Sequence, residues 1–298
     1  MENLKLFPVI DFSDWEKLNL PVTGIRKKQW LKNTTTGEVG LFKFPKTEHT
    51  GDYWAEKLAY ELGKLLGIEV ARTELGLCNG RIGSLSYNIL NDGEHLLEGY
   101  SIIGETLDFS TSSEIYDNIG VNYSVELIED VLGEQFNFIL DLLVFDCLIG
   151  NTDRHHGNWA VITDDNDKWL KLSPLYDNGS SLCYLEKIER IELMQKDTRM
   201  LEAALYTKSK SQIGLGNIRP ANHFDLFFYV CSKYNKDITS IVDKIESEVT
   251  EQSVSKLLEQ FDNNIIDAKI KEFIKLFITK RRDKMIDIFN KCGRMEEF

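Results

Sequence analysis

The feature that most constrains the fold is an apolar stretch, residues 136–149, followed at once by a run of polar residues. The stretch contains Asp141 and Asp146, and it is shorter than the roughly 20 apolar residues that a membrane-spanning helix needs. It therefore predicts a buried helix over residues 134–149 that ends at Gly150. The polar run 151–158 then follows directly from a buried element.

Composition excludes several classes of protein. The chain has 298 residues, enough for two core-sized units at about 150 residues each. Its 35 basic and 48 acidic residues give 35 − 48 = −13, which argues against nucleic acid or an anionic membrane as a partner, because both need a positive face. Hydrophobic residues (42%) and charged residues (28%) are in the range of globular proteins.

The cysteines and the N-terminus predict a cytoplasmic protein. Five cysteines lie far apart, which fits neither a disulfide framework nor a zinc site with C-x-x-C spacing. Reduced thiols are therefore expected. The N-terminus has no basic region followed by an apolar one, so no signal peptide is predicted.

The first third of the chain is rich in β patterns. A first strand with Trp30 and Leu31 at residues 29–31, turn residues 33–38 and a second strand over 39–44 predict a hairpin. Apolar positions at helical spacing predict a helix over 52–66 that Gly67 stops. Further strands are predicted near 69–77 and 82–90.

The remainder is mostly helical. Residues 108–125 and 207–220 are loop-like, and two short strands are predicted at 159–163 and 168–172. Helical patterns fill residues 224–298. The chain is therefore an α+β protein with a β-rich part, residues 1–90, and a largely helical part, residues 91–298. A ligand is expected in a cleft between the two unequal lobes.

The polar run and a later Asp match the needs of phosphoryl transfer from ATP. That reaction needs a base, Mg²⁺ ligands, a cation for the phosphates and a carboxylate that holds this cation. Asp153 and Asn158 are five residues apart, the spacing of base and metal ligand in protein kinases. Asp177, 24 residues beyond Asp153, can supply the second hard oxygen ligand.

Upstream residues supply the phosphate-binding candidates. Lys43 closes a strand, and Glu56 on the following helix is its predicted partner, with Glu61 as the less favoured alternative. The segment 23–28 precedes a strand and can cover phosphates with backbone N–H groups and cations. It is neither G-x-G-x-x-G nor a Walker A loop.

Other interpretations of single motifs are weaker. His155 and His156 are adjacent and point apart, and no third ligand has zinc spacing. Residues 164–167 lack the Gly and Glu that complete a calcium loop, so a turn is predicted. The basic triplet 280–282 is predicted to be a solvated helix face. It is the order of the five kinase-like elements along the chain that favours their joint interpretation.

Together these residues resemble the HipA-like serine/threonine kinases. The specific part is Asn-Thr-Asp-Arg-His-x-x-Asn at 151–158, followed by Pro-x-Tyr-Asp-Asn-Gly-Ser at 174–180. The strand 41–45, the helix 56–68, and residues 211–214 and 223–226 fit the same family, so the resemblance covers roughly residues 20–290.

The resemblance implies a bilobal protein-kinase-like fold with Mg-ATP as its nucleotide and the chain as a compact, single-module member. The small N-lobe, residues 1–90, would contain the phosphate loop and one helix. The larger helical C-lobe, residues 91–298, would carry the catalytic loop 151–158 and the metal-binding segment 173–181.

The resemblance also implies residue roles. Asp153 would be the catalytic base, Lys43 the phosphate lysine with Glu56, and Asn158 and Asp177 the metal ligands. The remaining nucleotide contacts would be the phosphate loop Thr23, Gly24, Ile25, Arg26, Lys27 and Lys28, the chain near Leu85 and Tyr87 for adenine, and the flanking His155 and Tyr176. Longer relatives carry an autophosphorylated serine where this chain has Pro21, which moves such a modification to Thr23.

The implied function is an ATP- and Mg²⁺-dependent kinase that phosphorylates Ser/Thr hydroxyls of proteins, as the toxin of a toxin–antitoxin pair with an antitoxin partner, or as a secreted effector. A phosphoinositide-type lipid kinase is the alternative enzyme, since Asp-Arg-His-x-x-Asn also resembles that class. The charge of −13 and the lack of a basic amphipathic helix oppose it. A catalytically silent kinase fold is opposed by the presence of Lys43, Asp153, Asn158 and Asp177.

Overall fold

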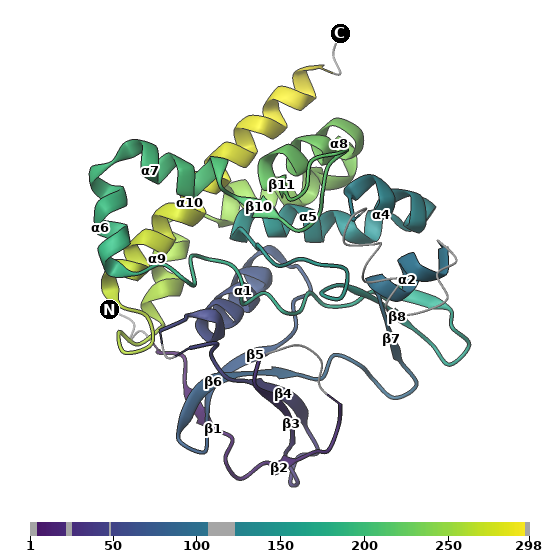
Figure 1. Cartoon of the computed structure of the whole chain (residues 1–298), viewed down its shortest axis with the longest axis vertical. Helices are drawn as coiled ribbons and strands as arrows, with labels where there is room; N and C mark the ends of the chain where they lie inside the picture. Colours follow the sequence, from purple (N-terminus) through teal and green to yellow (C-terminus); the bar gives the residue numbers. More distant parts are fainter. Residues whose placement is uncertain (1–4, 22–25, 48, 107–122, 296–298) are drawn as a thin grey trace. The chain divides into compact units, whose positions relative to one another are not determined.

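The computed structural model describes residues 5–21, 26–47, 49–106 and 123–295, and these form two compact units (Figure 1). The first unit comprises residues 1–89, 176–198 and 248–279. The second unit comprises residues 90–175, 199–247 and 280–298. Most of the predicted polar loop 108–125 lies outside the described residues.

The division differs from the predicted parts 1–90 and 91–298. The chain leaves the first unit after Ile89, near the predicted boundary, but it returns twice. The predicted metal-binding segment 173–181 is therefore divided between the units after Leu175. The physical reason is hydrogen bonding within the first unit: Gly179 donates to Glu56, and Phe7 donates to the carbonyl of Gln260.

The first unit contains a six-stranded sheet in the order β1-β5-β6-β4-β3-β2. Its strands are β1 Val9–Asp11, β2 Glu16–Lys17, β3 Lys28–Lys32, β4 Val39–Lys43, β5 Thr73–Cys78 and β6 Arg81–Tyr87. Strands β1 and β5 are parallel and the other pairs antiparallel. The β3–β4 hairpin and strands β5 and β6 confirm the prediction, whereas β1 and β2 are too short to show a pattern in the sequence.

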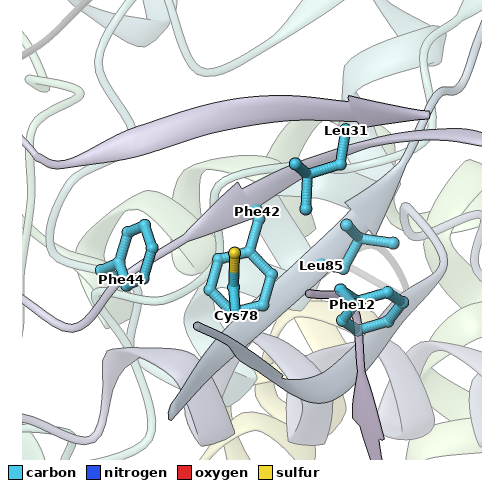
Figure 2. Packing of buried hydrophobic residues seen from close by; sticks show 6 residues of the cluster. All are labelled: Phe12, Leu31, Phe42, Phe44, Cys78 and Leu85. Carbon is cyan, nitrogen blue, oxygen red and sulfur yellow. The ribbon is translucent and has the colours of Figure 1, made fainter. Parts of the chain in front are cut away.

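One face of this sheet carries a buried cluster (Figure 2), formed by Phe12, Leu31, Phe42, Phe44, Cys78 and Leu85. The rings of Phe42 and Phe44 meet edge to face at 5.0 Å. Because successive side chains of a strand point to opposite faces, Phe42 points into the cluster and Lys43 points to the other face of the sheet. The apolar alternation of β4 thus decides which face can carry polar chemistry.

Helix α1, Asp52–Leu66, packs against β5 and β6. It ends as predicted at Gly67, whose φ of 70° is the left-handed conformation that glycine adopts without strain. The first unit also contains α6 Ile188–Lys196, α9 Glu251–Glu259 and the part of α10 Ala268–Met295 up to Thr279. A capping box between Thr250 and Ser253 starts α9.

The second unit has a three-stranded antiparallel sheet, β7-β8-β9, and a two-stranded one, β10-β11. Their bounds are β7 His95–Glu98, β8 Ala160–Thr163, β9 Trp169–Leu172, β10 Lys210–Ser211 and β11 Ala221–Asn222. The helices are α2 Gly99–Thr106, α4 Val125–Leu132, α5 Asn137–Ile149, α7 Thr198–Glu202, α8 His223–Glu248 and the end of α10, with a 3-10 turn η1 Gly133–Gln135 and a π turn η2 Ala203–Thr207. Strands β8 and β9 lie where the sequence predicts them.

Helix α5 confirms the predicted buried helix. Residues 142–149 are all buried, whereas Asn137, Phe138 and Asp141 near its start are exposed, and the helix ends at Gly150 with a φ of 66°. Across the described residues, the structure has no helix with the length and apolar character needed to cross a membrane. The complete burial of residues 142–149 makes the end of α5 a fixed point for the polar run that follows.

The cluster in Figure 2 should dominate the stability of the first unit. Truncating the fully buried Phe42 to Ala removes a ring from a packed core, so we expect a loss of about 3–5 kcal/mol of unfolding free energy. Urea unfolding followed by circular dichroism measures it. The control Lys32→Ala, at an exposed position on the neighbouring strand, should change stability by less than about 0.5 kcal/mol.

Candidate active site

The centre of the first unit's polar face is a group of three charged side chains, Lys43, Glu56 and Asp177. The amine of Lys43 lies 2.9 Å from Oδ1 of Asp177 and 3.4 Å from Oε2 of Glu56. Lys43 and Glu56 are buried, with 4% and 1% of their side chains exposed. The predicted contact between Lys43 and Glu56 is therefore present. The alternative partner, Glu61, instead pairs with Lys57 and Lys64.

Glu56 also accepts two backbone hydrogen bonds. The N–H of Asn178 donates to its Oε1 at 2.9 Å, and the N–H of Gly179 donates to its Oε2 at 3.1 Å. A Cβ at position 179 would lie 2.7 Å from the carbonyl oxygen of Asp52, so only glycine allows this close approach to α1. The carboxylate of Glu56 thus fixes both the strand lysine and the segment that carries Asp177.

Asp177 is the most solvent-exposed of the three side chains. Its side chain is 35% exposed, and its φ of 57° is left-handed, a conformation that costs a non-glycine residue on the order of 1–3 kcal/mol. The bonds from Asn178 and Gly179 to Glu56 hold the chain in this conformation. Asp177 is therefore the carboxylate of this group that a ligand can reach.

Charge pairing keeps Lys43 and Asp177 ionised. Burial by itself would lower the pKa of Lys43, but the carboxylates of Asp177 and Glu56 outweigh it and raise that pKa above its ordinary value. Burial opposes ionisation of Asp177, yet Lys43, Arg26 and Lys28 hold its pKa well below its usual range. At neutral pH, Asp177 is thus an anionic oxygen ligand of the kind that Mg²⁺ prefers.

The predicted phosphate loop is only partly visible, because Thr23, Gly24 and Ile25 lie outside the described residues. The guanidinium of Arg26 contacts the carbonyl of Phe44 at 2.8 Å and the buried carboxylate of Asp52 at 2.6 Å. Arg26 therefore anchors the segment to the start of α1, and its predicted contact with phosphate stays a prediction.

The two lysines of this segment differ in position. The amine of Lys27 lies over the ring of Phe44, at 5.2 Å from its centroid. Lys28 pairs across from Lys43 in the β3–β4 register, so both side chains share one face of the sheet. Of the described cations of the segment, Lys28 is the one that the sheet places beside Lys43.

The structure does not support Leu85 as an adenine contact. Its side chain is fully buried in the cluster of Figure 2, and β6 is paired by β4 on one side and β5 on the other. The ring of Tyr87 packs under the guanidinium of Arg72, at 3.9 Å. The half-buried side chains of Trp30 and Leu41 lie opposite each other on the Lys43 face and were missed, although strand alternation from Lys43 could have found Leu41.

The second unit builds the polar run 151–158 around a buried ion pair. Arg154 donates to Asp146 of α5 through Nε at 2.8 Å and Nη2 at 2.9 Å, and both side chains are buried. Its Nη1 donates to the carbonyl of Asn158 at 2.6 Å. Sequence reasoning did not identify Arg154, although a carboxylate inside an apolar helix signals that a buried cation must pair with it.

The five-residue spacing of Asp153 and Asn158 closes a turn. The side-chain amide of Asn158 donates to the carbonyl of Asp153 at 2.8 Å, which leaves its Oδ1 as the oxygen for a cation. The N–H of Asp153 donates to Oδ1 of Asn151 at 3.0 Å. Within the described residues, the half-buried carboxylate of Asp153 accepts no hydrogen bond, so its lone pairs remain for a substrate hydroxyl.

The predicted flanking residues lie in different units. His155 belongs to the second unit, is half-buried, and accepts a hydrogen bond from the N–H of Gly157 at Nδ1. Tyr176 belongs to the first unit and is half-buried. Their predicted contact with the nucleotide stays a prediction.

Comparison with known families decides the relationship. Residues 104–253, half of the chain, match the model of the HipA-like C-terminal domain. This chain belongs to the HipA-like C-terminal domain family. The matched residues include the run 151–158 and the segment 173–181, so the resemblance inferred from these residues is confirmed.

Relatives of this HipA-like chain extend the comparison. The serine/threonine-protein kinase CtkA of Helicobacter pylori strain J99 is 23% identical to this chain over 298 aligned positions. The alignment covers 94% of this chain and 87% of the relative. The crystal structure of a Helicobacter pylori proinflammatory kinase CtkA has a TM-score of 0.80 at 20% identity, covering 97% of this chain and 99% of that one. The predicted relationship to serine/threonine-protein kinases is thus confirmed.

A second structure shares the fold. HipA of Shewanella oneidensis MR-1, solved with HipB and its operator DNA, has a TM-score of 0.55 at 14% identity over 91% of this chain and 67% of that one. Both structures confirm the α+β class.

The Glu56 carboxylate should be required for the stability of the first unit. Glu56→Gln keeps the shape but removes the negative charge beside Lys43 and turns an acceptor into a donor near two N–H groups. Breaking a buried pair on one side costs about 3–5 kcal/mol, and we expect a loss in that range in urea unfolding. Lys64→Gln, at an exposed position on the same helix, is the control, and an equal loss in both variants would contradict this role of Glu56.

Acid should destabilise the second unit through His156. Burial first, and then His155, lower the pKa of His156 to about 4. The unfolded chain takes up this proton near pH 6.5 and the folded chain does not, so stability is present above about 6.5 and falls as pH drops toward 4. At pH 5 the cost is about 2 kcal/mol relative to pH 8.

The pH dependence of urea unfolding measures this cost. His156→Gln should reduce the loss between pH 8 and pH 5 by about 2 kcal/mol, whereas His95→Gln, at an exposed histidine, should leave it unchanged. An identical slope in wild type and His156→Gln would show that His156 does not contribute.

Proposed function

We propose that this chain is an ATP- and Mg²⁺-dependent kinase that transfers the γ-phosphoryl group of ATP to Ser or Thr hydroxyls of a protein substrate. The observation that carries the proposal is the group of Lys43, Glu56 and Asp177, in which a buried carboxylate holds a lysine beside a more open carboxylate. The relationship to a serine/threonine-protein kinase over 94% of the chain supports the same conclusion.

In this proposal Lys43 binds the α- and β-phosphates, and Glu56 keeps it oriented. Lys28, on the same face of the sheet, adds positive charge for the phosphates. The half-buried side chains of Trp30 and Leu41 on that face offer an apolar surface for the adenine ring of ATP. These contacts bind and orient the nucleotide and take no part in making or breaking bonds.

Magnesium fits the oxygen atoms that the chain offers. Asp177 is anionic, and the amide of Asn158 has its oxygen left for a cation, so the two supply hard ligands of the kind that Mg²⁺ takes. When bound, Mg²⁺ would neutralise charge on the phosphates during transfer. Asp177 and Asn158 would hold it.

Asp153 acts on the acceptor. Its carboxylate is half-buried and its backbone is held at the N–H by Asn151 and at the carbonyl by Asn158. The carboxylate can therefore accept the hydrogen bond of a Ser or Thr hydroxyl and orient its oxygen for attack on the γ-phosphorus, taking the proton as the new bond forms.

Two asparagine variants separate this chemistry from nucleotide binding. Asp153→Asn should lower transfer from labelled ATP by about 10²–10⁴-fold and leave ATP affinity within a few fold, because only the acceptor loses its base. Asp177→Asn should lose both transfer and Mg²⁺-dependent affinity, because a ligand of a divalent cation is weakened. A transfer assay on cell lysate and an ATP titration with and without Mg²⁺ measure the two effects.

The controls follow from the same assays. Asp165→Asn, on an exposed turn of the second unit, should match wild type in both. Near-normal transfer by Asp153→Asn would show that its spacing to Asn158 has no catalytic meaning. Absence of any ATP-dependent stabilisation at any Mg²⁺ concentration would refute the kinase proposal itself.

The finer predictions concern partners. An antitoxin partner is supported by the HipA relative, whose structure contains HipB and operator DNA. Co-purification of this chain with the product of a neighbouring gene tests it. The roles as toxin or secreted effector, modification at Thr23 and the cytoplasmic location stay predictions from the sequence.

A further inference from the structure

Asn151, the first residue of the polar run, has all four of its polar groups engaged. Its N–H donates to the carbonyl of Asp146 at 3.2 Å, and its side-chain amide donates to Oδ1 of Asp146 at 3.3 Å. Its Oδ1 accepts from the N–H of Asp153. The remaining group, its carbonyl, accepts from Nε2 of His223 at 2.7 Å. His223 therefore reaches Asp153 through one residue.

The hydrogen bonds around His223 run in one direction. A carbonyl can only accept, so Nε2 of His223 carries the proton, and Nδ1 of the neutral ring is an acceptor. The hydroxyl of Ser209 lies 2.8 Å from Nδ1 and donates to it. Arg281 Nη1 lies 2.6 Å from the same hydroxyl and can only donate. The direction of each hydrogen bond from Arg281 through Ser209 and His223 to Asn151 is thus fixed.

Arg281 fixes the far end of the chain of bonds. Its guanidinium is fully buried, so the prediction of a solvated helix face over residues 280–282 is wrong at this position. Arg281 also donates through Nε to the carbonyl of Cys147 on α5 at 2.8 Å and through Nη1 to that of Leu205 at 2.9 Å. His223 and Ser209 are 2% and 7% exposed. Because water does not compete in such surroundings, losing one member leaves its neighbours unsatisfied.

We propose that His223 is a positioning residue of the kinase: together with Ser209 and Arg281 it holds Asn151, and through Asn151 it sets the backbone of Asp153. The inference rests on the proposed function for its catalytic consequence. Its structural content, a tether from α8 and α10 to the loop that carries the base, does not. The sequence shows none of this, because 72 residues separate His223 from Asn151.

The tether requires an uncharged ring. Burial first, and then the charge of Arg281, lower the pKa of His223 to about 3, so the ring is uncharged at neutral pH. The charged groups around it are Arg281 from α10 and, beyond Asn151, the Asp146–Arg154 pair of α5 and the loop. A proton on Nδ1 would face the hydroxyl hydrogen of Ser209, so this hydrogen bond would be lost. It would also add a second positive charge beside Arg281.

The test compares three variants of the full chain in the labelled-ATP assay. His223→Leu removes donor and acceptor, and we expect kcat to fall about 10- to 100-fold with the KM for ATP within about twofold, since misplacing a catalytic group costs rate and the nucleotide contacts are elsewhere. His223→Gln keeps a donor and an acceptor without titrating and should restore kcat to within about threefold of wild type.

A packing control separates positioning from simple destabilisation. Val230→Ala truncates a fully buried side chain of the same helix α8 and should lower the unfolding free energy without changing kcat at a temperature well below its transition. Equal losses of kcat in Val230→Ala and His223→Leu, or a His223→Gln variant as slow as His223→Leu, would overturn the proposal. Ser209→Ala replaces His223→Leu if the latter does not fold.

Hydrogen exchange of the peptide 150–158 tests the tether without any activity. In His223→Leu, the amides of Asn151 and Asp153 should exchange about tenfold faster or more, and in Val230→Ala they should not, because local opening follows the lost tether. Unchanged exchange in His223→Leu would overturn the proposal. If wild type transfers no phosphate but exchange changes as expected, the kinase proposal fails and the tether stands.

Discussion

The structure depends most on one buried carboxylate, that of Glu56. An ionised carboxyl group away from water is costly unless its oxygens are paired and hydrogen-bonded. Here Lys43 from β4 and the N–H groups of Asn178 and Gly179 satisfy them. Helix α1, strand β4 and the segment after Leu175 are thereby held together, because moving any one of them leaves a buried charge unsatisfied. Asp177 owes its place and its left-handed backbone to that constraint.

The second unit uses the same physical device. Asp146 projects from the buried end of α5 and is neutralised by Arg154, which also holds the carbonyl of Asn158. Arg154 therefore ties the polar run 151–158 back to helix α5, directly after which the run begins. Asp153 is left with its backbone fixed and, within the described residues, with a carboxylate that accepts no hydrogen bond, which is what its proposed role as base requires.

Much of the local structure could be predicted because its causes are local. The β3–β4 hairpin, the end of α1 at Gly67 and the end of α5 at Gly150 follow from alternation, helical spacing and glycine. The pairing of Lys43 with Glu56 could also be predicted, since both lie on consecutive elements. These features need no knowledge of distant parts of the chain.

Other features depend on distant parts of the chain. Arg26 was expected to bind phosphate; its ion pair with the buried carboxylate of Asp52 could not be read from the sequence, and the phosphate contact stays a prediction. The backbone near Leu85 was expected to meet adenine, but at Leu85 strand β6 is paired by β4 on one side and β5 on the other, and the Leu85 side chain lies in the cluster of Figure 2. Pattern and propensity describe which face a residue takes relative to its strand, and they do not say what that face meets.

By itself, the sequence determined the elements, the buried helix and the order of the polar residues along the chain, because spacing and hydrophobic pattern act over a few residues. Only the tertiary structure decided that residues 176–198 and 248–279 join the first unit, and that His223 and Arg281 reach Asn151 and Ser209. The reason is physical. A buried polar group takes whichever partner folding brings to it, and that partner can lie anywhere in the chain.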